Sequence, residues 1–125
     1  MIITNPMRQA MADAFDTKIN TATPPGDIIF ETSGDVALVT CALNNPAFGN
    51  ATTAGVLSLS TGTAVSGTAT ASGTVAQASI YDGASTKMCE FTCAATGAEI
   101  TISNASIAVS DVVQLTALTV TMPAS

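Results

Sequence analysis

The sequence predicts a mainly β protein, an antiparallel β-sandwich or jelly roll with one short N-terminal helix. Its 125 residues fit a single domain. Beyond residue 27, short apolar and β-branched stretches alternate with Gly, Asn, Asp and Ser, which indicates about seven or eight short strands. Helical spacing of apolar residues occurs only near the start. We therefore expect residues 1–27 to form a helix and a Pro-containing arm, and residues 28–125 to form one β-sandwich domain.

The helix is predicted over residues 6–19. Asn5 can cap it, and Pro6 suits the first helical position. Apolar side chains recur at every fourth residue, and Ala10 and Ala14 widen the stripe that they form: Met7, Met11, Phe15 and Ile19. An isolated helix of this length is marginal in water, so the stripe needs a partner surface. Two partners stay open, the chain's own sheet and a neighbouring subunit.

Pro24, Pro25 and Gly26 end this helix, because paired prolines force extended backbone and glycine permits a turn. Three strands are expected next, with a turn at residues 33–35 between the first two: residues 28–32, 36–43 and 55–59. In the loop at residues 44–50, Phe48 is apolar among turn residues. It either folds back as a plug over the edge of the core or serves as an exposed anchor.

Residues 61–72 consist almost entirely of Thr, Ala, Ser and Gly, and Val65 is their only apolar side chain larger than a methyl group. This tract either forms a small-residue strand close to another backbone or is a loop that becomes ordered on contact. Its composition does not separate the two.

Residues 74–81 and 86–93 flank a four-residue turn at 82–85, which predicts a β-hairpin. In the second arm, alternation places Met88, Glu90 and Thr92 on one face and Lys87, Cys89, Phe91 and Cys93 on the other. Phe91 and the two thiols then mark the buried side.

The last third of the chain is expected to hold a strand at residues 99–103, a turn region at 104–111 and a long strand at 112–122. The apolar phase slips within the long strand, because Val113 and Leu115 alternate oppositely to Leu118 and Val120. A β-bulge or bend is expected near Ala117.

Charged residues make up 10% of the chain, and the net charge is −6. Arg8, Lys18 and Lys87 are the only bases and are dispersed, whereas nucleic acids and anionic membranes need clustered cations. We therefore expect no nucleic-acid or membrane partner. The polar start contains no signal peptide and no apolar run reaches membrane-spanning length, so we expect synthesis in the cytoplasm.

Histidine is absent, which removes the commonest general base and metal ligand. Cys41, Cys89 and Cys93 lack zinc spacing and are expected to be buried, reduced thiols. A carboxylate pair at Asp13 and Asp16, and a calcium loop at Asp82, lack the required oxygen spacing, so helix solvation and turn formation explain these acids better. We expect no enzyme activity, no catalytic residue, no cofactor and no metal.

Much of the 47% hydrophobic content is alanine, and aromatic residues make up 4%, so the core is expected to be thin. A thin core and a weakly charged surface favour association, because few ions must be desolvated in an interface. We expect a homo-oligomer, a dimer or trimer. Its candidate interface residues come from the helical stripe, the 44–50 loop and the small-residue tract: Met7, Met11, Phe15, Ile19, Phe48 and Val65.

The order of these features resembles a family of small tailed-bacteriophage proteins associated with head decoration or cement roles. The resemblance rests on the N-terminal helix, on Pro24-Pro25, on VALVTCALNNPAFG at residues 36–49 and on SDVVQLTALTVTMP at residues 110–123. Family members commonly carry an aromatic and arginine stretch where this chain has VAQASIY at residues 75–81, so no arginine-mediated contact is implied here.

The resemblance implies a structural virion protein on the exterior of the capsid, with the major capsid protein as its partner and no catalytic residues. A tail, spike or fibre component is an alternative within the virion. An adhesin-like carbohydrate-binding β-sandwich is a further alternative, although such proteins use exposed Trp and Tyr platforms and this chain has Tyr81 alone.

Overall fold

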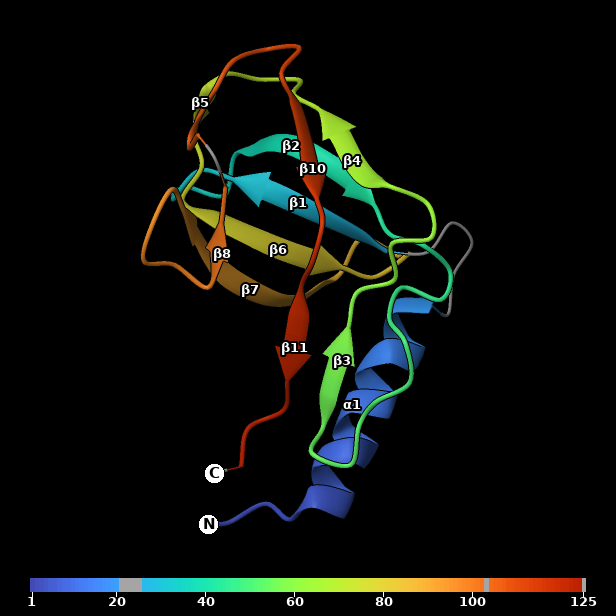
Figure 1. Cartoon of the computed structure of the whole chain (residues 1–125). Coiled ribbons are helices and arrows are strands. Elements are labelled where there is room, and N and C mark those ends of the chain that lie inside the picture. Colours follow the sequence, from blue (N-terminus) through green and yellow to red (C-terminus); the bar gives the residue numbers. More distant parts are fainter. Residues whose placement is uncertain (21–25, 103, 125) are drawn as a thin grey trace.

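One helix and eleven short strands make up the computed structural model, which describes residues 1–20, 26–102 and 104–124 (Figure 1). The protein is mainly β with one N-terminal helix, as predicted. The predicted turn at Pro24 and Pro25 lies outside the described residues. The elements are α1 (Asn5–Asn20), β1 (Asp27–Glu31), β2 (Ala37–Ala42), β3 (Val56–Ser58), β4 (Val65–Thr68), β5 (Gly73–Thr74), β6 (Gln77–Tyr81), β7 (Lys87–Ala94), β8 (Ile100–Thr101), β9 (Ser106–Ile107), β10 (Val112–Leu115) and β11 (Thr119–Thr121).

The largest sheet has the strand order β2-β1-β6-β7-β8. Two hairpins build most of it: β1 pairs antiparallel with β2, and β6 pairs antiparallel with β7 and with β1. The hairpin of β6 and β7 was predicted, and for β1 and β2 the two strands and the turn between them were predicted, because each pair is joined by a local turn that contains Gly, Ser and Asp. The strand β8 was expected near residues 99–103, but it has two residues and pairs parallel with β7.

One face of this sheet supplies the centre of the core. Ile28 and Phe30 on β1 lie beside Ala78 and Ile80 on β6, and all four are fully buried. The period of two along each strand places these side chains together and turns their neighbours to the opposite face. The sheet therefore has one apolar face and one polar face.

The strand β4 lies over β2 and pairs antiparallel with β10 (Figure 1). A Cβ atom on Gly67 would meet the backbone carbonyl of Thr40, so only glycine allows the two strands to approach this closely. The small-residue tract thus forms a strand against another backbone, which resolves the two alternatives left open by its composition. Val65 of this strand is fully buried.

The helix α1 packs against β3 and the preceding loop instead of the large sheet (Figure 1). Gln9 Nε2 donates to the Ala51 carbonyl at 3.5 Å, and the Ala47 N–H donates to Asn20 Oδ1 at 3.0 Å. The first helical hydrogen bond is accepted by the Thr4 carbonyl, one residue before the predicted cap at Asn5.

The buried face of α1 differs from the predicted stripe. Ala12 and Ile19 are buried, whereas Met7 is 55% exposed and Ala10 and Ala14 are exposed. The apolar stripe was predicted from spacing alone, and the narrow β3 ribbon covers less of the helix than a broad sheet would.

The predicted C-terminal strand is divided in two. Its first part, β10, pairs with β4, and its second part, β11, pairs with β3 in a separate ribbon. The break at residues 116–118 agrees with the phase slip expected near Ala117. The preceding region, predicted as a turn at residues 104–111, contains β9, which pairs with β5. The strand predicted at residues 74–81 is shorter than expected, because β6 begins at Gln77.

A β-bulge changes the face on which Lys87 lies. The register shifts between Ile80 and Tyr81, so that Ile80 opposes Cys89 and Tyr81 opposes Lys87. Cys93 is buried and Phe91 half-buried, as predicted. Lys87, however, lies with Glu90 on the polar face, and the prediction that it shares the face of the thiols is wrong.

Candidate binding groove between β8 and β10

The curled sheets leave a seam between β8 and β10. Among the described residues, β8 is the last strand of the five-stranded sheet, and β10 is joined in its ladder to β4 alone. Among the described residues, no backbone hydrogen bond joins β8 to β10. Each strand therefore has one edge that is not paired with another strand.

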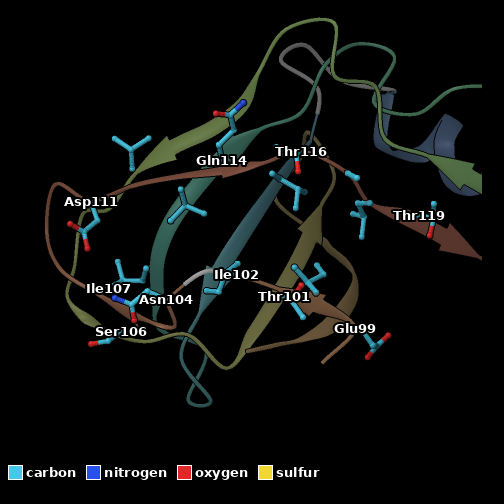
Figure 2. A pocket seen from close by; sticks show the side chains of 16 residues that line it. Glu99, Thr101, Ile102, Asn104, Ser106, Ile107, Asp111, Gln114, Thr116 and Thr119 are labelled. Carbon is cyan, nitrogen blue, oxygen red and sulfur yellow. Dashed lines mark hydrogen bonds between the residues drawn. The ribbon is translucent and has the colours of Figure 1, made fainter. Parts of the chain in front are cut away.

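A groove of about 820 Å³ occupies this seam, lined by residues of β8, β9, β10 and the start of β11 (Figure 2). Gln114 and Thr116 lie along one side, and Thr101 and Ile102 lie on the opposite side. Beneath it lie residues of the core, of which Ile102 and Val113 are half-buried and the others are buried: Ile100, Ile102, Ile107, Val113, Leu115 and Leu118. Val112, which is 71% exposed, and Ala117 also line the groove and are exposed.

The rim of the groove is polar and acidic. Of the described residues that line it, Glu99 and Asp111 carry a charge, and both are acids. Glu99 Oε1 accepts a hydrogen bond from the Thr92 N–H at 3.2 Å, and Asp111 Oδ2 accepts one from the Ala108 N–H at 2.9 Å. Both carboxylates are thereby held in place beside the groove.

The pairing of β10 shows which of its backbone groups face the groove. Asp111 and Ala69 lie opposite each other, next to the pair Val112–Thr68, and the Ala69 N–H donates to the Asp111 carbonyl at 2.7 Å. Opposed pairs in an antiparallel ladder alternate between hydrogen-bonded and non-hydrogen-bonded. Val113 therefore bonds to β4, while Val112 and Gln114 direct their N–H and C=O groups to the unpaired side.

The structure places the six predicted interface residues in different settings. Ile19, Phe48 and Val65 are buried within the chain. Phe48 forms an isolated bridge with Leu59, and its ring centroid lies 6.1 Å from that of Phe15. Phe48 is thus the plug over the core edge and not an exposed anchor.

Met7 and Met11 are the more accessible part of the predicted stripe. Met7 is exposed and Met11 is half-buried, and both lie on α1, away from the groove. None of the six predicted residues lines the groove. Sequence reasoning did not identify the groove, although the phase slip near Ala117 marked the point where its long wall bends.

A second polar cluster lies on the opposite face of the large sheet, around Glu31. The Glu31 side chain is buried, with 2% of the residue exposed. It accepts hydrogen bonds from Ser79 Oγ at 2.6 Å, from Tyr81 Oη at 3.0 Å and from Gln77 Nε2 at 3.2 Å. The alternation of β6 places these three donors on one face, opposite Glu31 on β1.

Lys87 completes the cluster, with its Nζ atom 3.7 Å from Glu31, 3.2 Å from Asp35 and 3.0 Å from Glu90. Desolvation raises the pKa of Glu31, but the hydrogen bonds from Ser79, Gln77 and Tyr81 and the charge of Lys87 outweigh it and hold that pKa below its usual value. The hydrogen bond to Glu90 is the largest effect that raises the pKa of Lys87. The carboxylate is thus ionised and fully bonded, which suits a structural role that ties the two hairpins together.

The three thiols are free; Cys41 and Cys93 are buried as predicted, whereas Cys89 is half-buried. Burial raises the pKa of Cys41, Cys89 and Cys93 to about 11. The nucleophilic form of cysteine is the thiolate, which is scarce at neutral pH when the pKa is that high.

Two of the other acids considered from the sequence, Asp82 and Asp16, have local partners. Asp82 Oδ1 accepts hydrogen bonds from the Ala84 and Thr86 N–H groups and so closes the β6–β7 turn. Asp16 Oδ1 accepts one from Asn20 Nδ2 within α1. Among the described residues, no group of three or more Cys, Asp or Glu side chains is placed to hold a metal ion.

Comparisons with protein-family models, with curated proteins and with solved structures found no match. In the part of the chain that the structure describes, no helix has the length and apolar character needed to span a membrane.

Proposed function

We propose that this chain is a capsid decoration, or cement, protein that binds the outer surface of a tailed-phage head and stabilises contacts between capsid subunits. The observation that carries the proposal is the open groove between β8 and β10, where, among the described residues, the unpaired edge of β10 lies beside apolar residues of the core. Such a groove suits attachment to another protein more than turnover of a small molecule.

The surface composition supports the same role. With 10% charged residues, the chain presents mainly Thr, Ser, Ala, Asn and Gly to its surroundings, which lowers the cost of burying that surface in an assembly. Its net charge of −6 is unsuited to the DNA-filled interior of a head and compatible with its exterior.

The resemblance to phage decoration proteins rests partly on residues 110–123, and this segment forms the long wall of the groove and β11. A homo-oligomer on the head remains part of the proposal, with Met7 and Met11 as the accessible candidates on α1.

The alternatives have less support. A carbohydrate-binding role calls for aromatic stacking platforms, and none of the described residues that line the groove is aromatic. A tail, spike or fibre role uses the same kind of surface, and the location of the protein on the virion distinguishes it.

The test compares phage heads that carry the protein with heads that lack it. We expect purified protein to bind the deficient heads saturably and to restore their resistance to heat and chelator. The proposal is wrong if the protein does not bind, or if deficient heads are as stable as complete ones. Binding to isolated tails instead of heads favours the tail or fibre role.

A further inference from the structure

We infer that the groove between β8 and β10 binds an extended segment of the partner protein by strand addition, and that this segment carries Lys or Arg at its ends. The inference rests on the proposed function, since it names the chemistry by which a shell subunit is recognised.

The backbone of β10 offers hydrogen bonds to a new strand. Val112 and Gln114 direct their N–H and C=O groups to the unpaired side, because Val113 bonds to β4. Proteins usually cover or protect such strand edges, because an exposed edge can pair with a strand of another chain. An incoming strand beside β10 would find a preformed ladder.

The space fits one short strand. One extended residue between packed layers occupies about 160 Å³, taking the rise along a strand, the distance between strands and the distance between layers. The groove of about 820 Å³ therefore holds about five residues. This length is close to the four residues of β10.

The floor selects the side chains of the segment. Val113 is half-buried below, with the core residues Ile100 and Leu115 buried beneath the groove, while Thr101 and Gln114 are exposed above. Because side chains alternate along a strand, the segment should alternate apolar residues that face the floor with polar residues that face solvent.

The charge of the rim favours basic residues at the ends of the bound segment. Glu99 and Asp111 are acidic, and the described lining residues include no base. A segment with Lys or Arg at its ends is attracted to this rim, and the attraction weakens as salt is added.

A second copy of this chain is a poorer occupant. Each copy carries a net charge of −6, so the acidic rim of this groove disfavours an acidic copy as its occupant, and the homo-oligomer proposed above would use other contacts. The three bases already have acceptors elsewhere: Arg8 Nε donates to the Met122 carbonyl, Lys18 lies beside Asp82, and Lys87 lies among acids on the opposite face of the sheet.

The first experiment measures binding of a fluorescent seven-residue peptide, Lys-Val-Thr-Val-Thr-Val-Lys, to the full chain by fluorescence anisotropy. We expect saturable binding that weakens with salt. The same peptide with alternate backbone nitrogens methylated keeps its side chains and charge but cannot form the ladder, so it should bind about ten-fold more weakly or worse. A peptide with Glu at both ends should also bind more weakly. Equal binding of the methylated peptide, or no saturable binding of the parent peptide, overturns the inference.

Two variants locate the site. Gln114→Pro removes an N–H that faces the groove and leaves the ladder to β4 intact, so we expect about ten-fold weaker peptide binding, with Gln114→Thr as the matched control. The double variant E99Q/D111N keeps the shape of the rim and should weaken binding and flatten its salt dependence. Circular dichroism verifies that each variant is folded, and the double variant keeps the test decisive if the proline variant unfolds. Unchanged binding by a folded proline variant or by the double variant contradicts the inference.

Head binding separates this inference from the proposed function. If wild-type protein binds heads and folded Gln114→Pro binds them equally well, the groove is not the contact while the decoration role stands. If wild-type protein binds the peptide and does not bind heads, strand addition stands and the decoration role fails. Self-association that excludes the peptide overturns the choice of occupant.

Discussion

Replacement of Gly67 by alanine tests the close contact between β4 and β2. The added Cβ would lie 2.9 Å from the Thr40 carbonyl carbon and closer still to its oxygen, whereas ordinary contact begins at 3.4 Å. The strands must separate by at least about 0.5 Å, the difference between these two distances. Because the obstacle is backbone, no side-chain rotation relieves the overlap.

Overpacking of this kind costs about 1–3 kcal/mol, and a backbone obstacle favours the upper half of that range. We therefore expect Gly67→Ala to lower the free energy of unfolding by about 2–3 kcal/mol, a large share of the roughly 5–15 kcal/mol of a typical domain. At about 4 °C per kcal/mol, the melting temperature should fall by about 8–12 °C.

Urea unfolding followed by circular dichroism measures this change. Gly62→Ala is the matched control from the same small-residue tract, because a Cβ there meets nothing within 4 Å. The control should be unchanged or up to about 1 kcal/mol more stable. If Gly67→Ala and Gly62→Ala have the same stability, the account of β4 as a strand pressed against β2 is wrong.

Three further predictions concern the core, the polar cluster and the thiols. Phe48→Ala should lower the free energy of unfolding by about 3–5 kcal/mol in urea titrations, because Phe48 is a buried plug; a change below about 1 kcal/mol would mean that the loop does not close the core. The pKa of Glu31 is lower in the folded chain, so Glu31 stabilises the fold above its unfolded pKa and loses that effect as the pH falls through the folded value. Glu31→Gln should therefore flatten the loss of stability below about pH 4.5, and an unchanged acid profile would contradict this. The thiols of Cys41, Cys89 and Cys93 should react slowly with a disulfide reagent at pH 7 and quickly in denaturant, because burial raises their pKa to about 11 in the folded chain. Rapid reaction of the folded chain would contradict the raised pKa of these thiols.

Elements defined by nearby residues were predictable from the sequence. The turns at residues 33–35 and 82–85 each join strands that are adjacent in the chain, so β1, β2, β6 and β7 follow from local chemistry. The helix was also predictable, because its apolar spacing and Pro6 are local signals. The face that it buries was not, because that face depends on contact with β3, which lies far along the chain.

The groove depends on pairings that no local pattern specifies. The strand β10 pairs with β4, more than forty positions earlier, and β8 pairs parallel with β7, so the unpaired edges follow from long-range topology. The face of Lys87 depends on a bulge opposite Tyr81, which simple alternation cannot anticipate. The split of the C-terminal strand was detectable because the slip in apolar phase lies within that strand.

Cryo-electron microscopy of phage heads saturated with the purified protein tests the proposed decoration role most directly. The proposal predicts density for this fold on the outer surface of the shell, bridging neighbouring capsid subunits, with an extended segment of a subunit seated between β8 and β10. Density confined to the tail, or no ordered density on the head, would contradict the decoration role. Bound protein whose groove faces solvent would contradict strand addition.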